Sequence, residues 1–277
     1  GAPRERPGAS FFQMKPLRTL PASRARSIRA IFTDVDGTLT TSGKLLASTY
    51  QALWRWRQEG RVLVLVTGRS AGWAEAMARL WPVDAVAAEN GGIAFVPQGE
   101  RLERLYATAP AQLARDRARM FRAAKLVARR VPGAALSSDS RYTEVDLAID
   151  YNEENRLGAE AAGEIERVLR SRGLHAVRSS VHVNFWAGDF DKLWMCRKLL
   201  ARLGLDASEA VYVGDSVNDE PMFQGFPDSV GVANVRDVLP QLTHHPRWIT
   251  RAREGRGFEE LVRTLLSARA TGRVRRR

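Results

Sequence analysis

The sequence predicts an α/β protein with a doubly wound, mainly parallel sheet core and an inserted α+β cap domain. Short apolar strands alternate with helices along 28–97 and again along 188–268, which is the order that produces such a core. The run Val-Leu-Val-Leu-Val at 62–66 is typical of a strand buried on both faces of a parallel sheet. The 125 residues from Thr67 to Lys192 far exceed the roughly 30 residues of one βαβ unit, so they predict an insertion.

The elements of the core follow from apolar runs and the residues that end them. A strand over 28–33 precedes a helix that we expect to begin at Ser48, from its capping-box spacing, and to end at Gly60. After the strand 62–66 we expect a helix to about residue 80 and a strand over 85–88. The second half of the core is predicted to hold a helix over 192–203, a strand over 210–213 and the start of a helix at 220–223.

The insertion has its own alternation of elements and predicts a cap at 98–187. Apolar residues recur on one face of two predicted helices, 110–130 and 154–172, which end at Pro132-Gly133 and Gly173. Strands are predicted over 142–151, 176–178 and 181–186. We expect Gly99 and Gly188 to be hinges, since the chain crosses between core and cap near them.

Composition excludes several classes of protein. Hydrophobic residues are 44% and charged residues 27%, which is ordinary for a globular chain and excludes wholesale disorder. No apolar run approaches the roughly 18 residues that span a membrane, and we expect no signal peptide. The single cysteine, Cys196, excludes an internal disulfide and suits a reducing compartment, so we expect a cytoplasmic protein with Cys196 buried.

The net charge of +12 lies at the two ends of the chain. Residues 1–30 and residues 251–277 each carry a net +6, and residues 31–250 are neutral overall. We expect a basic, flexible segment at 1–27 and a basic tail at 269–277. Since only these ends are basic, nucleic acid is not the expected partner, and a polyanion-binding role through them is the alternative from another functional class.

Polar side chains cluster where the predicted strands end. Carboxyl ends of parallel strands meet at one edge of a sheet, which is where such sheets bind ligands. The four segments are Asp34-Val35-Asp36-Gly37-Thr38, Thr67-Gly68-Arg69-Ser70, Asp191-Lys192 and Gly214-Asp215-Ser216-Val217-Asn218-Asp219. Two carboxylates about 4 Å apart repel by about 4 kcal/mol at an effective dielectric of 20, so several together need cations. Lys192 supplies one positive charge, and Mg²⁺ suits oxygen ligands with room for phosphate, so the segments are equipped for phosphoryl transfer.

In this order, the four segments resemble the motifs of the haloacid dehalogenase-like (HAD) phosphatases over nearly the whole of 28–266. The insertion is similar to the type-2 cap of that superfamily, and Glu89-Asn90-Gly91 resembles its Cof-type subgroup. The resemblance implies a Rossmann-like core and a phosphatase. Sucrose-phosphate, mannosyl-phosphoglycerate and phosphoglycolate phosphatases belong to this group, so the implied substrate is a phosphorylated sugar or another small phosphorylated metabolite.

The resemblance also implies a role for each motif residue. Asp34 would be the nucleophile that forms an aspartyl-phosphate, and Asp36 would be the general acid and then the general base. Mg²⁺ would be bound by Asp34, the main-chain carbonyl of Asp36 and Asp215, with Asp219 nearby. Phosphate oxygens would be held by Thr67, the Gly68 amide and Lys192, which also neutralises the nucleophile. Asn218 would orient either the phosphate or Lys192.

Specificity is expected to lie in the cap. The candidate substrate residues are Arg141, His182 and Asn184 from the cap and Asn90 from the core. The segment 183–188 departs from the more usual acidic, proline-bearing run, so its substrate contacts are not implied by the resemblance.

Some roles stay open at this point. Asp191 is expected to cap the helix that begins at Lys192. Arg69 is either a substrate or cap contact or an ion-paired residue. A phosphomutase or phosphotransferase would use the same aspartyl-phosphate chemistry with a different acceptor, and the sequence does not separate it from a hydrolase.

Overall fold

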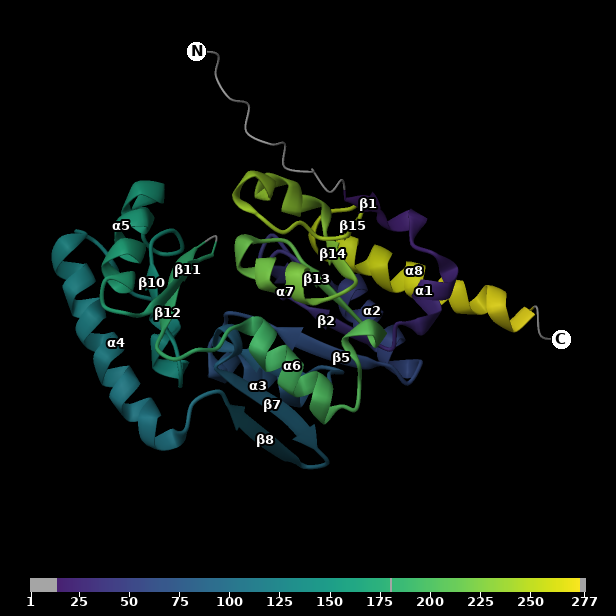
Figure 1. Ribbon diagram of the computed structural model, residues 1–277, viewed down its shortest axis with the longest axis horizontal. Coiled ribbons are helices and arrows are strands. Elements are labelled where there is room, and N and C mark those ends of the chain that lie inside the picture. The colour runs from purple at the N-terminus through teal and green to yellow at the C-terminus, as the bar shows by residue number, and fades with distance from the viewer. Residues whose placement is uncertain (1–13, 180, 275–277) are drawn as a thin grey trace, which may run out of the picture.

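The computed structural model describes residues 14–179 and 181–274, which form a large sheet domain and a smaller inserted unit (Figure 1). The large sheet has nine strands in the order β1-β15-β14-β13-β2-β5-β6-β7-β8. Neighbouring strands from β1 to β6 are parallel, and β7 and β8 add an antiparallel edge. The strands are β1 (Lys15–Pro16), β2 (Ala30–Thr33), β5 (Val62–Val66), β6 (Ala85–Ala88), β7 (Ile93–Gln98), β8 (Arg101–Tyr106), β13 (Ala210–Gly214), β14 (Ser229–Gly231) and β15 (Trp248–Ile249).

Helices cover both faces of this sheet, so the prediction of a doubly wound core is confirmed. Alternate residues of β2 and β5 point to opposite faces and join two separate apolar clusters. One cluster contains Ile31 and Leu63 with residues of α2, α3 and α8, and the other contains Phe32 and Val64 with residues of α6 and α7. The helices of the core are α1 (Ala22–Ser27), α2 (Ala47–Gln58), α3 (Ala71–Leu80), α6 (Lys192–Arg202), α7 (Glu220–Gly225) and α8 (Glu254–Val274).

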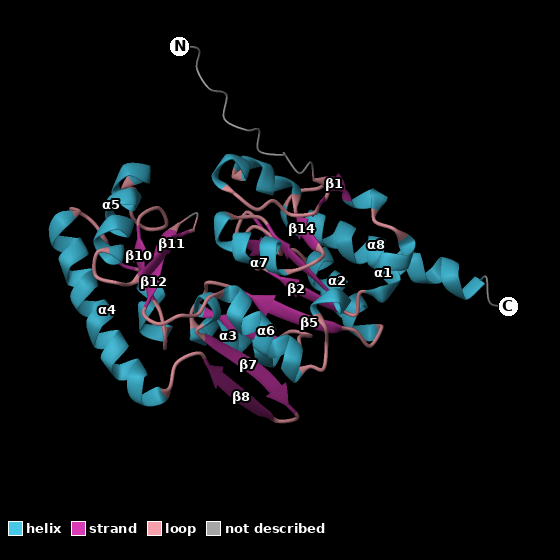
Figure 2. Cartoon of the chain, in the orientation of Figure 1, coloured by secondary structure: helices cyan, strands magenta, loops and turns pink. Residues whose placement is uncertain are grey.

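The inserted unit is a small antiparallel sheet with two helices packed on one face, as Figure 2 shows on its left-hand side. Leu147 and Phe185 of the sheet share an apolar cluster with Met120 and Ile165 of the helices. The strand order is β11-β12-β10-β9. The elements are α4 (Pro110–Arg130), β9 (Ala135–Leu136), β10 (Leu147–Asp150), α5 (Gly158–Arg170), β11 (His175–Arg178) and β12 (His182–Trp186). This unit is the predicted cap.

One predicted boundary between core and cap is wrong. The chain does not leave the core at residue 98, because β7 and β8 form a hairpin that continues the large sheet, and Gly99 with φ +61° lies in its turn rather than at a hinge. The link into the cap lies instead at 107–109, before α4. At the other link a Cβ on Gly188 would lie 3.3 Å from Thr108, so the two connecting segments are neighbours.

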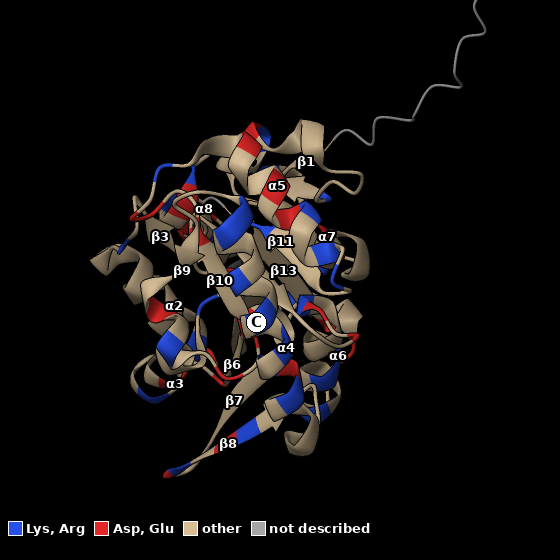
Figure 3. Cartoon of the chain, turned by 90° about the vertical axis from the view of Figure 1, so that its left-hand side faces the viewer, with Lys and Arg blue, Asp and Glu red and all other residues tan. Residues whose placement is uncertain are grey.

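The described part of the N-terminal segment is folded. Residues 14–27 were expected to be flexible, but β1 pairs with β15, and Leu17 and Ala25 are buried in the core. At the other end, residues 269–274 continue α8 rather than forming a separate tail. Residues 1–13 and 275–277 lie outside the described residues. Elsewhere basic and acidic positions are interspersed over the surface (Figure 3), and none of the described helices is both long and apolar enough to cross a membrane.

Three predicted element starts differ from the structure, and a side-chain hydrogen bond lies at each of them. The helix α2 begins at Ala47, and Ser48 donates to Glu259 instead of capping the helix. The strand predicted from residue 142 begins only at Leu147, because Glu89 accepts the N–H groups of 144–146. Likewise Asp150 accepts the N–H groups of 152–155, which delays the start of α5 to Gly158.

Candidate active site

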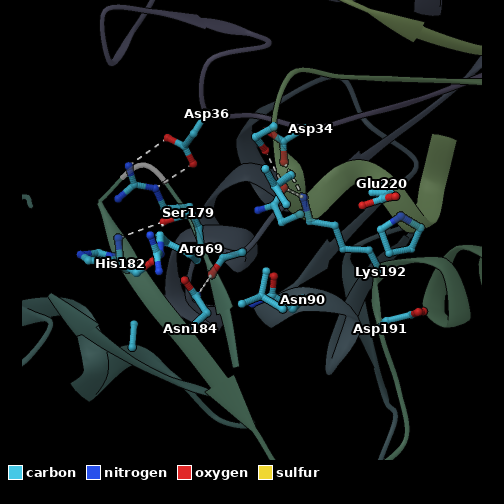
Figure 4. Close-up of a pocket in the computed structure, with 18 of the residues that line it drawn as sticks. Asp34, Asp36, Arg69, Asn90, Ser179, His182, Asn184, Asp191, Lys192 and Glu220 are labelled. Atoms are coloured by element: carbon cyan, nitrogen blue, oxygen red, sulfur yellow. Dashed lines mark hydrogen bonds and ion pairs between the residues drawn. The ribbon is translucent and has the colours of Figure 1, made fainter. Parts of the chain in front are cut away.

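The parallel strands bring the predicted motif residues to one edge of the sheet, below the cap. Asp34 follows β2, Thr67 follows β5 and Asp215 follows β13, and β2 is the neighbour of both other strands. Lys192 is the first residue of α6, whose predicted cap is confirmed: Asp191 accepts from the Trp194 N–H at 2.7 Å. Asp34, Asp215 and Lys192 line a cleft of about 1630 Å³ between core and cap (Figure 4), whereas Thr67 is buried beside it with its Oγ1 accepting from the Arg69 N–H.

Lys192 is buried between two carboxylates. Its side chain is 2% exposed, and Nζ lies 2.8 Å from Asp34 Oδ1 and 2.9 Å from Asp219 Oδ1. Burial alone disfavours the charged ammonium, but the two carboxylates outweigh it and raise the pKa of Lys192 above its usual value. Nζ also donates to Asn218 Oδ1 at 3.2 Å, so Asn218 contacts the lysine that the sequence analysis expected it to orient.

Asp219 is already engaged by five donors. Its Oδ1 accepts from Lys192 and the Tyr212 hydroxyl, and its Oδ2 accepts from the Asp215 N–H and from the N–H and hydroxyl of Ser216. Although burial opposes ionisation, Lys192 and these hydrogen bonds lower the pKa of Asp219. The residue therefore holds Lys192 and the loop at 215–216 in place, and its oxygens have little capacity left for a direct metal bond.

Asp34 and Asp215 are less well compensated. Burial is the largest cause of a pKa well above the usual value at Asp34, with Lys192 opposing it. At Asp215, burial and the nearby Asp219 carboxylate raise the pKa to about 7. One oxygen each of Asp34, Asp215 and Asp219 lie within 4.8 Å of one another. A buried group of carboxylates with excess negative charge suits a hard divalent cation such as Mg²⁺, so the residues present fit this metal.

The sequence analysis missed Asn234, which holds Asp215 in place. Asn234 lies in the turn after β14, and its Nδ2 donates to Asp215 Oδ2 at 2.8 Å and to the Gly37 carbonyl at 3.0 Å. Thr38 donates to the other oxygen, Oδ1, at 2.8 Å. The only signal in the sequence is that Asn234 follows a strand whose carboxyl end lies at this same edge of the sheet.

Asp36 lies at the rim of this cluster with its side chain turned toward Arg69. The guanidinium of Arg69 donates to both carboxylate oxygens of Asp36, at 3.0 and 2.9 Å, and lies 4.0 Å from Glu153 of the cap. Figure 4 shows Asp36 facing Arg69 and away from Lys192. The hydrogen bond with Asp36 raises the pKa of Arg69. The structure therefore shows Arg69 as an ion-paired residue, and its second ion pair, with Glu153, is a contact with the cap.

The candidate substrate residues separate into two groups. His182 and Asn184 of β12 line the cleft together with Asn90 from the core. His182 pairs with Glu153 at 2.8 Å, and Asn184 donates to the Gly68 carbonyl at 3.2 Å. Arg141 lies outside the cleft, exposed and with its guanidinium over the ring of Tyr142, so its role as a substrate residue stays a prediction.

Comparisons of the sequence and the fold with known proteins show which family the chain is similar to. The family model of haloacid dehalogenase-like hydrolases matches residues 28–226. The chain is 26% identical to a phosphoglycolate phosphatase of Archaeoglobus fulgidus over 86% of its length and 96% of that protein. It is 32% identical to a phosphoglycolate phosphatase of Halorubrum lacusprofundi over 73% of its length and 82% of that protein.

Among solved structures, the fold is similar to protein 0175 of Thermoplasma acidophilum, with a TM-score of 0.70 and 19% identity, covering 86% of this chain and 98% of that one. It is also similar to the sucrose-phosphatase of Synechocystis, with a TM-score of 0.64 and 15% identity, covering 87% of this chain and 98% of that one. The strand-end motifs, the capped fold and the match over 28–226 together show that the chain belongs to the haloacid dehalogenase-like hydrolase family, as one of its phosphatases.

Proposed function

We propose that this phosphatase is a Mg²⁺-dependent phosphomonoester hydrolase that works through an aspartyl-phosphate, with phosphoglycolate as its first candidate substrate. The observation that carries the proposal is the buried contact of Lys192 with Asp34 at the end of β2, beside the uncompensated carboxylate of Asp215. This arrangement provides a nucleophile, a fixed positive charge and oxygen ligands for a metal in one cleft. The relatives named phosphoglycolate phosphatase support the choice of substrate.

In the first step, Asp34 is the nucleophile. Lys192 holds its Oδ1, so the other oxygen is available to form a bond to phosphorus while the ester P–O bond breaks. Lys192 and the amide of Gly68 stabilise the negative charge on the phosphoryl oxygens. Asp34, Asp215 and the main-chain carbonyl of Asp36 would hold Mg²⁺, which supplies further neutralisation of that charge.

Asp36 is the acid and base of the two steps. It donates a proton to the alcohol oxygen as the ester bond breaks, and it then accepts a proton from the water that attacks the aspartyl-phosphate. The attack of water breaks the bond between phosphorus and Asp34, which releases inorganic phosphate and restores the carboxylate. Because Arg69 occupies both oxygens of Asp36 in the structure, Asp36 must exchange this partner for the substrate oxygen before it can donate.

The experiment is to measure release of inorganic phosphate from phosphoglycolate, phosphoglycerate, hexose phosphates and p-nitrophenyl phosphate, with Mg²⁺ and with EDTA. We expect release that depends on Mg²⁺ and is abolished in Asp34→Asn. The matched control is Asp206→Asn, which alters an exposed carboxylate outside the cleft and should retain wild-type turnover. No phosphate release from any of these esters by the Mg²⁺-loaded protein refutes the proposal.

A sugar phosphate is the second candidate, because the cleft is larger than a two-carbon acid needs. Its volume of about 1630 Å³ exceeds the roughly 300–1000 Å³ of most small-ligand sites, although the cleft is open to solvent. Higher kcat/KM for a hexose phosphate than for phosphoglycolate favours it. Formation of an isomeric sugar phosphate without free phosphate would instead indicate the mutase alternative.

Two expectations from the sequence remain predictions. Polyanion binding would depend on the basic terminal segments, of which 1–13 and 275–277 lie outside the described part of the chain, and it predicts salt-sensitive binding of nucleic acid that is indifferent to Asp34→Asn. A cytoplasmic location agrees with a Cys196 side chain that is buried and unbonded to another cysteine, and cell fractionation tests it.

A further inference from the structure

A buried carboxylate outside the motifs lies at the junction of core and cap. Asp146 is 1% exposed, and its Oδ2 accepts from the Nδ2 atoms of Asn90 at 3.0 Å and Asn184 at 3.4 Å. Its hydrogen-bond donors are neutral amides, and the charges that influence it, Glu89 and Asp139, are both negative. Burial and the Glu89 carboxylate raise the pKa of Asp146 well above its usual value. Burying a carboxylate without a positive partner costs free energy. Asp146 at this buried position is therefore explained better by a functional role than by packing.

The two amides come from opposite sides of the cleft and meet over Gly68. This glycine belongs to the segment 67–70 after β5, which the proposed function makes the phosphate loop. Asn90 belongs to the core turn after β6 and has a left-handed backbone with φ +55°, whereas Asn184 lies on β12 of the cap. A Cβ on Gly68 would lie 3.3 Å from Asn90 Oδ1 and 3.5 Å from Asn184 Nδ2, so both side chains cover this glycine. Asn184 Nδ2 also donates to the Gly68 carbonyl. Its two N–H donors are thus shared between Gly68 and Asp146, which leaves Nδ2 no hydrogen for a substrate.

Asp146 is itself fixed to the core. Its N–H and those of Glu144 and Val145 donate to the carboxylate of Glu89, which is fully buried and also accepts from the Ala71 N–H at the start of α3. A Cβ on Gly92 would lie 2.6 Å from Val145 Cγ1, so the Val145 side chain of the cap segment packs directly on the Gly92 backbone of the core. The carboxylate of Asp146 is therefore a fixed acceptor to which the amide of the cap residue, Asn184, and that of the core residue, Asn90, are both attached.

We propose that Asp146 is a positioning residue, whose carboxylate fixes the amides of Asn90 and Asn184 over Gly68 and so sets the geometry of the phosphate loop when the cap lies on the core. The proposal rests on the proposed function, in which the Gly68 amide holds the phosphoryl group. Asp146 lies in the wall of the cleft but is only 1% exposed, so the proposal is that it acts through the two asparagines. Binding of inorganic phosphate should depend on it as well as turnover, because both use the same loop.

The test compares two substitutions of similar shape. Asp146→Leu keeps the branched side chain but removes the acceptor, and we expect kcat/KM for phosphoglycolate and for p-nitrophenyl phosphate to fall about tenfold to a hundredfold, since misplacement by about 1 Å can cost that much. Asp146→Asn keeps one acceptor oxygen and should remain within about threefold of wild type, because a carbonyl oxygen has lone pairs for both amides. The matched control is Asp116→Leu, which alters another buried carboxylate of the cap that is bonded to Gln112 and lies outside the cleft.

A double-mutant cycle shows whether Asp146 acts through Asn184. The combination Asp146→Leu with Asn184→Ala should lose less activity than the product of the two single losses, because part of the effect of Asp146 passes through Asn184, whereas independent roles would multiply the two losses. Multiplied losses overturn the proposal, as does wild-type kcat/KM in Asp146→Leu or an equal loss in Asp146→Leu and Asp146→Asn. If Asp146→Leu does not fold, as judged by circular dichroism, Asp146→Ser replaces it, since the short hydroxyl cannot reach both amides.

Calorimetric titration with inorganic phosphate separates this inference from the proposed function. We expect affinity for phosphate to fall about tenfold in Asp146→Leu and to stay near wild type in Asp146→Asn, in line with the loss of well-placed hydrogen bonds in a buried site. Wild-type protein that binds phosphate but hydrolyses no ester refutes the proposed function alone. Wild-type phosphate affinity in Asp146→Leu refutes the role of Asp146 whether or not the enzyme turns over.

Discussion

The stability of the metal-free protein should depend on pH through Asp215. Its pKa is about 7 in the folded protein because burial and Asp219 disfavour its ionisation, against about 3.9 in an unfolded chain. A difference of about three units, at about 1.4 kcal/mol per unit, corresponds to about 4 kcal/mol. Since the folded state holds the proton more tightly, this stability is present below about pH 4 and is lost as the pH rises through about 7.

The other aspartates modify this dependence in known directions. The raised pKa of Asp34 acts in the same direction as that of Asp215, so it adds to the loss of folding stability as the pH rises. Asp219 acts in the opposite direction, because the stability from its lowered pKa is lost only as the pH falls through that low folded value. Between about pH 5 and 8 the free energy of unfolding in EDTA should therefore fall as the pH rises, by about 2.6 kcal/mol from Asp215 alone, since about two of the three units lie in this window.

Urea unfolding at several pH values, with EDTA and with saturating Mg²⁺, measures this effect. Mg²⁺ binds the ionised carboxylate, so it should reduce the loss above pH 7, and its affinity should fall about tenfold for each unit below pH 7 as a proton competes for Asp215. Asp215→Asn should flatten the metal-free dependence, while Asp206→Asn should leave it unchanged. A metal-free wild-type curve that is level from about pH 5 to 8, or one that Asp215→Asn does not alter, would refute the reasoning.

Three further substitutions test the site. Asp34→Asn should reduce phosphate release by more than about a thousandfold, because the nucleophile is lost. It should not lower Tm, because burial already disfavours the charged form of Asp34, and a lower Tm would contradict this reasoning. Asn234→Ala should weaken Mg²⁺ binding about tenfold to a hundredfold by calorimetry, since Asp215 loses the amide that orients it, and unchanged affinity would contradict that role. Gly37→Ala should impair Mg²⁺ binding and lower Tm, because φ is +79° and the added Cβ would lie 2.6 Å from Asp215 Oδ2; a silent substitution would show that the loop can move aside.

Much of the core could be predicted because its signals are local. The predicted strand 62–66 is β5 with the same bounds, and the apolar residues of β6 and β13 likewise indicate buried strands. Strand ends then place Asp34, Thr67 and Asp215 at one edge through topology alone. The β7–β8 hairpin was missed because β8 is Arg-Leu-Glu-Arg-Leu-Tyr, a charged edge strand whose pattern does not distinguish it from the start of the insertion.

The residues that escaped prediction are those that act on another residue rather than on a ligand. Asn234 lies 19 positions along the chain from Asp215, and Asp146 lies 38 positions from Asn184. No short sequence motif therefore joins either residue to the side chain that it holds. Their hydrogen bonds exist only because two turns or two strands meet in the folded chain. Glu89 is intermediate: the sequence singles it out only within the segment that resembles the Cof-type subgroup, whereas its partners are backbone N–H groups of Ala71 and of the cap residues 144–146, which carry no side-chain signature. A sequence therefore shows which groups carry out the chemistry more readily than it shows which groups hold them still, and in this enzyme the second set includes a buried carboxylate at the joint between core and cap.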